Sequence, residues 1–163
     1  MKPIASFALL LFASLAPSVA LGWGEQGHNA IWILAQSKLT PEAKQKVADI
    51  LAGDKLALTA VWMDEALSAA RTHTGTLAND EEAAQFNSHF SNNASWHFVD
   101  LPLKAISYQD GVQFTSSDDV VHALSLAIKA LEGTESSLSK RIALRAIVHF
   151  VGDIHQPLHC AEG

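Results

Sequence analysis

The spacing of apolar residues along the first third of the chain predicts two consecutive helices. Between residues 24 and 39 the apolar positions recur at mostly helical intervals. The sequence Thr40-Pro41-Glu42 then supplies a helix cap, a proline in the first turn and an acidic residue near the positive end of the helix dipole. A second helix is therefore expected from Pro41 to about Leu51, with Gly53 ending it.

Two further helices are expected in the middle of the chain. Residues 56–70 and the short acidic stretch 80–86 both carry helical spacing. The stretch from Asn87 to Pro102 is rich in Ser, Asn and aromatic residues and lacks sustained periodicity. It is predicted to be a loop or a short extended segment.

The last third of the chain predicts two more helices. Ser117-Asp118-Asp119 is typical of a helix start, and Gly133 is expected to close that helix. A long amphipathic helix should then run from Ser136 to about Gln156, where Pro157 must end or kink it because proline has no backbone N–H to donate. No stretch alternates as a strand would, so the predicted fold class is all-α.

Residues 1–22 have the pattern of a secretory signal peptide. A basic residue, Lys2, precedes an apolar run that ends in small residues before Trp23. The run is short for a bilayer span and is broken by Ser and Pro, so no stable membrane association is expected. Cleavage after Ala20 and cleavage after Gly22 both satisfy the small-residue rule. The second choice makes Trp23 the new N-terminus of a secreted or periplasmic protein with one domain over residues 23–163.

Composition limits how such a protein can bind a polyanion. The 163 residues include 17 acidic and 11 basic ones, for a net charge of −6, and loss of Lys2 with the signal peptide would make it −7. A protein that binds nucleic acid mainly through Lys and Arg is basic. Any nucleic-acid chemistry here therefore needs another anchor for phosphate, and metal cations are the candidate.

The end of the sequence suggests a longer protein. Cys160 is the single cysteine, and in an oxidising compartment an odd thiol suggests a partner outside the sequence in view. Gly163 follows directly on a dense cluster of polar residues without any tail-like segment. We therefore expect the chain to be an N-terminal fragment.

The densest candidate chemistry lies in His149-Phe150-Val151-Gly152-Asp153-Ile154-His155-Gln156-Pro157-Leu158-His159. His149 and Asp153 are four residues apart, so a helix projects both from one face toward a common ion. His159 follows the proline, where the chain can turn back toward that face. Imidazole and carboxylate ligands of this kind suit zinc.

Three other segments carry weaker signals. Trp23-Gly24-Glu25-Gln26-Gly27-His28 offers a metal the amine and carbonyl of a processed Trp23, together with the His28 imidazole. Asp64 and His97 each lie among apolar or aromatic residues, where a capping Asp or a core histidine is the ordinary alternative. The four remaining histidines are predicted to be surface or supporting residues: His73, His89, His122 and His155.

Together these motifs, over Trp23 to Gly163, resemble the secreted zinc-dependent single-strand nucleases of fungi, plants and bacteria. The resemblance implies the helical fold shared with zinc phospholipase C, truncated here at the C-terminus, and a cluster of three zinc ions. It implies that Asp64, His97, His149 and Asp153 hold one zinc, that Trp23 and His28 with a shared Asp153 hold another, and that His159 begins a third site. Two further ligands of the third zinc would lie downstream of Gly163.

The resemblance also implies an activity. A monomeric endonuclease of this kind hydrolyses phosphodiester bonds of single-stranded DNA and RNA to 5′-phosphate products, with Asp64 orienting or deprotonating the attacking water. Phe98 would stack on a base, unless it belongs to the core, and Asp100 would bind the base edge. The alternatives are a zinc phospholipase C-type lipid phosphodiesterase, which exposed apolar residues around the site would mark, and a non-catalytic secreted zinc-binding protein.

Overall fold

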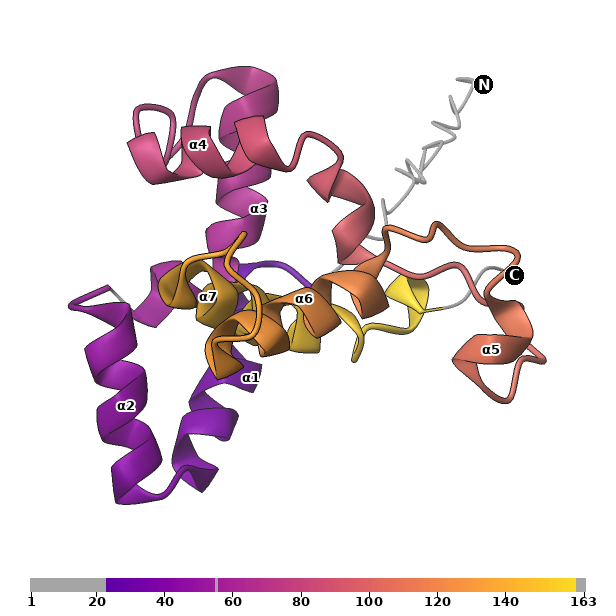
Figure 1. The fold of residues 1–163 in the computed structure, drawn as a ribbon, viewed down its shortest axis with the longest axis horizontal. Helices are drawn as coiled ribbons and strands as arrows, with labels where there is room; N and C mark the ends of the chain where they lie inside the picture. The colour runs from indigo at the N-terminus through magenta and orange to yellow at the C-terminus, as the bar shows by residue number, and fades with distance from the viewer. Residues whose placement is uncertain (1–22, 55, 161–163) are drawn as a thin grey trace, which may run out of the picture.

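The computed structural model describes residues 23–54 and 56–160; the predicted signal peptide lies outside them. The described part is built from helices and contains no strand (Figure 1), so the all-α prediction is confirmed. The α-helices are α1 (Glu25–Lys38), α2 (Pro41–Leu51), α3 (Leu56–Thr72), α4 (Glu81–His89), α5 (Tyr108–Gly111), α6 (Val120–Glu132) and α7 (Lys140–Asp153). Two 3-10 turns complete them, η1 (Asn93–His97) and η2 (Pro157–His159).

Most helix boundaries follow the capping residues in the sequence. The Thr40 hydroxyl accepts from the Ala43 amide at the start of α2, and the Asp119 carboxylate accepts from two amides at the start of α6. Gly133 ends α6 with a φ of 81°, in the left-handed region that glycine enters at no steric cost. Each cap satisfies backbone groups that the helix itself leaves unpaired.

Two predicted elements need correction. The predicted loop Asn87–Pro102 contains the end of α4 and the whole of η1. Helix α7 begins at Lys140 instead of Ser136, because the Ser139 hydroxyl caps it by accepting from Ile142. It also ends at Asp153, ahead of Pro157, which opens η2.

Helix α7 is the centre of the packing. It contacts α1, α2, α3, α6 and η1, whereas α5 lies apart at one edge of the molecule (Figure 1). The main core joins α7 to α3, α4 and α6 and contains the aromatic residues Trp62, Phe86, Trp96 and Phe150. In the described part, no helix is long and apolar enough to cross a membrane.

A buried arginine connects α7 to the start of α3 and to α4. The Arg145 guanidinium bonds to Asp54 at 2.7 Å and to Glu82 at 2.6 Å, and its central carbon lies 4.8 Å from the centre of the Trp62 ring. Such a charge is tolerated in a core only when its donors are satisfied. The network fixes how α3 lies against α7, and both helices carry predicted metal ligands.

Candidate metal centre

Helix α7 carries two fully buried members of the site. His149 and Asp153 are four residues apart on one face, and the His149 Nε2 lies 3.2 Å from an Asp153 oxygen. The other ring nitrogen, Nδ1, donates to the Ala60 carbonyl on α3 at 2.9 Å. This bond orients the imidazole, so that Nε2 points toward the carboxylates.

This part of the site requires a positive charge. Burial lowers the pKa of His149, but its hydrogen bonds with the Asp153 and Asp64 carboxylates outweigh burial and raise the pKa to about 10. The pKa values of both carboxyl groups are lowered in turn, because their bonds to His149 outweigh burial. The pocket therefore holds two carboxylate charges, which a proton on His149 or a metal ion in its place can neutralise.

Two residues from other elements complete this group of donors. The His97 Nδ1, at the end of η1, lies 3.1 Å from both the Asp153 carboxylate and the His149 Nε2. Asp64 on α3 approaches His97 and His149, each at 3.5 Å. The Asp64 side chain is 49% exposed, whereas the other three are buried. Asp64 is thus the member of the group that faces solvent.

Helix α1 contributes His28 through a close approach to α7. Its Nε2 lies 3.5 Å from Asp153, and its ring stacks on the His149 ring with centroids 4.1 Å apart. Burial, followed by repulsion from His149, lowers the pKa of His28 to about 4. His28 therefore remains neutral near pH 7, with ring nitrogens able to bind a metal.

Glycines make this approach possible. A Cβ on Gly152 would lie 2.5 Å from the His28 Nδ1, and a Cβ on Gly27 would collide with the Trp23 indole. No role for Gly152 was predicted from the sequence. Its signal was a glycine in the interior of a predicted helix, which is costly unless the packing needs it.

The donors form two overlapping groups that could each hold a metal ion. One group is His28, His149 and Asp153, and the other is Asp64, His97 and His149; within each group all ligand atoms lie within 4.8 Å of one another. Three imidazoles and two carboxylates are the ligand types that zinc takes. The residues present therefore fit a zinc site.

His159 lies beside these groups and belongs to neither of them. Its Nδ1 donates to the His97 carbonyl at 2.7 Å and lies 3.6 Å from an Asp153 oxygen. Its own carbonyl accepts from the Val99 amide at 2.8 Å. These bonds hold η2 against the segment after η1. The Nε2 of His159 takes part in none of them.

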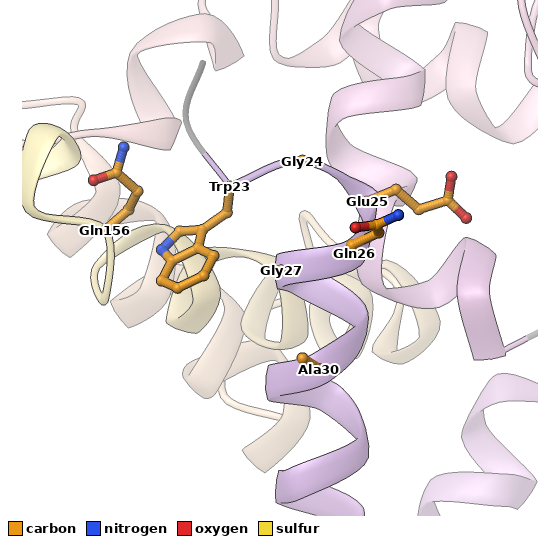
Figure 2. A pocket seen from close by; sticks show the side chains of 7 residues that line it. All are labelled: Trp23, Gly24, Glu25, Gln26, Gly27, Ala30 and Gln156. Carbon is orange, nitrogen blue, oxygen red and sulfur yellow. The ribbon is translucent and has the colours of Figure 1, made fainter. Parts of the chain in front are cut away.

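Trp23, just ahead of α1, is partly exposed. It lines an open pocket with Gly24, Glu25, Gln26, Gly27, Ala30 and Gln156. Figure 2 shows its indole between Gln156 and the start of α1. Of the predicted ligands, only Trp23 lines this pocket, so the pocket is adjacent to the metal centre and separate from it.

The predicted base-binding pair lies on the segment after His97. Phe98 has an extended backbone and a side chain that is 37% exposed, whereas Val99 is buried and Asp100 is half-buried. Phe98 and Asp100 are thus both more accessible than Val99 between them. Neither described core cluster includes Phe98.

The remaining polar residues lie outside the centre. The four other histidines are exposed, as the sequence predicted. The Cys160 thiol donates to the Ile154 carbonyl, and burial raises its pKa. Asn93, which begins a glycosylation sequon, is buried, and its amide donates to Asn87 and to the Phe90 carbonyl.

In its described part the chain is helical and gathers His and Asp side chains from α1, α3, η1 and α7 around one point, which is the architecture of a helical metal-binding protein. The S1/P1 nuclease family model matches residues 23–163. The chain belongs to the S1/P1 nuclease family.

Curated relatives agree with this family at low identity. Endonuclease 2 of Arabidopsis thaliana is 28% identical over 92% of this chain and 48% of its own length. Nuclease S1 of Aspergillus oryzae is 27% identical over 85% of the chain and 44% of its own length, and nuclease P1 of Penicillium citrinum is 28% identical over 84% and 47%. The chain thus spans about half the length of the curated relatives it matches.

Proposed function

We propose that the protein is a secreted zinc-dependent endonuclease that hydrolyses phosphodiester bonds of single-stranded DNA and RNA to 5′-phosphate products. The observation that carries the proposal is the convergence of His28, His97, His149 and Asp153 with the solvent-facing Asp64. Membership of the S1/P1 nuclease family supports the reaction class. The family match begins at Trp23, which supports removal of residues 1–22 and a domain over 23–163.

The roles of the site residues are assigned from the burial of their side chains. Zinc, when bound, supplies positive charge that stabilises a phosphoryl transition state and acidifies water. His149, His97 and Asp153 are held rigidly by helices, so their role is to hold the ion. Asp64 reaches solvent, so we assign it the orientation or deprotonation of the attacking water. We assign Trp23, with His28 and the shared Asp153, to a second ion, and His159 to a third ion that needs two further ligands.

The preference for single strands follows from Phe98 and Asp100. An exposed aromatic ring stacks on a base face, and a paired base cannot present that face. Asp100, two residues further on, can accept a hydrogen bond from a base edge. This arrangement also explains how an acidic protein can bind a polyanion, because metal ions bind the phosphate and Phe98 stacks on the base.

The test is cleavage of single-stranded DNA by protein that begins at Trp23, produced both to Gly163 and with any native sequence that follows. We expect cleavage that stops with a chelator and returns with zinc, and 5′-phosphate ends on the products. Double-stranded DNA of the same sequence is the control. Zinc-loaded protein that cleaves neither RNA nor DNA would contradict the proposal.

A lipid phosphodiesterase is the second candidate, because of one surface feature. The segment 103–114 exposes four large apolar side chains: Leu103, Ile106, Val112 and Phe114. Exposed apolar residues close together are typical of surfaces that contact lipid or another protein. Hydrolysis of phosphatidylcholine vesicles in place of single-stranded DNA would favour this candidate.

A further inference from the structure

Each of the three residues Phe98, Val99 and Asp100 makes a hydrogen bond through its backbone to a more distant part of the chain. The Phe98 carbonyl accepts from the Val120 amide at 3.1 Å, and the Val99 amide donates to the His159 carbonyl. The Asp100 amide donates to the Thr115 hydroxyl at 3.3 Å. The third bond differs from the others because it depends on a side chain, so substitution can remove it.

Thr115 is itself fixed by a buried carboxylate. Its hydroxyl donates to Asp119 at 3.1 Å, and the same Asp119 oxygen accepts from the Tyr108 hydroxyl at 3.1 Å. The other Asp119 oxygen caps α6 through the Val121 and His122 amides. Asp119 is 1% exposed, so all of its capacity as an acceptor is used within the protein.

These contacts form a series of hydrogen bonds that leads from the buried Asp119 to the segment proposed to bind the substrate. The first turn of α6 fixes Asp119, Asp119 orients the Thr115 hydroxyl, and that hydroxyl holds the backbone of Asp100. A hydroxyl can do this because it donates and accepts at the same time. A methyl group in its place can do neither.

We propose that Thr115 is a positioning residue for base recognition, with Asp119 as its anchor. The inference rests on the proposed function, since it presumes that Phe98 and Asp100 bind a base. The hydrogen bonds of the Thr115 hydroxyl go to Asp100 and Asp119, so Thr115 sets where Asp100 lies relative to Phe98. Its loss should therefore weaken substrate binding and leave the chemical step intact.

The experiment compares Thr115→Val, which keeps the shape and removes the hydroxyl, with Thr115→Ser, which restores it. We expect Thr115→Val to raise KM for a single-stranded oligonucleotide about fivefold, the loss of one hydrogen bond, with kcat unchanged. Thr115→Ser should restore KM. Hydrogen exchange at the Asp100 amide should become about tenfold faster in Thr115→Val alone, a readout independent of activity.

Two controls distinguish the loss of the Thr115 hydrogen bonds from a general loss of local order. Thr134→Val removes an exposed hydroxyl that donates to the Lys129 carbonyl, and Tyr108→Phe removes the neighbouring bond to Asp119 while Thr115 remains; both should keep the wild-type KM. An unchanged KM in Thr115→Val, or an equal rise in Tyr108→Phe, would overturn the inference. Absence of cleavage by the zinc-loaded wild type would instead remove the proposed function and this inference with it.

Discussion

The candidate metal centre and the segment 98–116, which we propose binds the substrate, lie side by side but are built differently. The ligands His28, His149 and Asp153 are fully buried on helices that pack against one another. The neighbouring segment contains one short helix, exposes Phe98 and Phe114, and is held by both backbone and side-chain hydrogen bonds. The comparison indicates that the predicted metal ligands are placed by helix packing, whereas the proposed substrate segment is placed by individual polar contacts.

The largest effect should come from the network that holds α3 against α7. Arg145→Met leaves Asp54 and Glu82 without their buried partner, and breaking such a pair costs about 3–5 kcal/mol. Urea unfolding measures the loss. Arg141→Met is the matched control, because Arg141 bonds to the same Glu82 near the surface and should cost about 1 kcal/mol or less. Equal losses in the two variants would contradict the account.

The next effect tests the close approach of α1 and α7. Gly152→Ala places a methyl group against the His28 ring, so we expect about 1–3 kcal/mol of destabilisation from overpacking and weaker zinc binding. Thermal unfolding with and without zinc measures both. Gly24→Ala adds the same methyl where no atom lies within 4 Å and should change little. Unaltered zinc affinity in Gly152→Ala would show that His28 does not bind the ion.

A smaller effect is expected on the substrate side. Phe98→Ala should weaken binding of single-stranded DNA by about 1–3 kcal/mol, the contribution of one stacked base, without changing zinc content. Fluorescence anisotropy with a labelled oligonucleotide measures it. Ile106→Ala, at a side chain that is 96% exposed, should leave DNA binding unchanged. The opposite result, with binding lost only in Ile106→Ala, would favour the lipid phosphodiesterase.

The same contrast explains what could be predicted from the sequence. Helical spacing and capping residues predicted α2 and α6 to within a few residues, and the four-residue spacing of His149 and Asp153 placed both on one face. The start of α7 was placed too early, because the turn before it depends on the Glu135 carboxylate, which accepts from the Ser136 and Ser137 amides. The amphipathic pattern does not distinguish such a turn from the first turn of the helix.

The contacts between segments that are far apart in the chain could not be predicted from the sequence. Nothing local indicates that the Ala60 carbonyl orients His149, or that Thr115 holds Asp100. Both bonds join positions far apart in the chain and arise only when the helices pack. The role of Gly152 was accessible in principle, since glycine inside a helix signals a close approach.

The zinc content of the purified protein tests the central claim most directly. Protein beginning at Trp23 would be dialysed against zinc and then against metal-free buffer, and bound zinc would be counted per chain by elemental analysis. The account predicts at least one retained zinc in the wild type and in His155→Ala, an exposed histidine of the same motif, and loss of that zinc in His149→Ala. A wild-type protein without zinc, or zinc retained in His149→Ala, would contradict it.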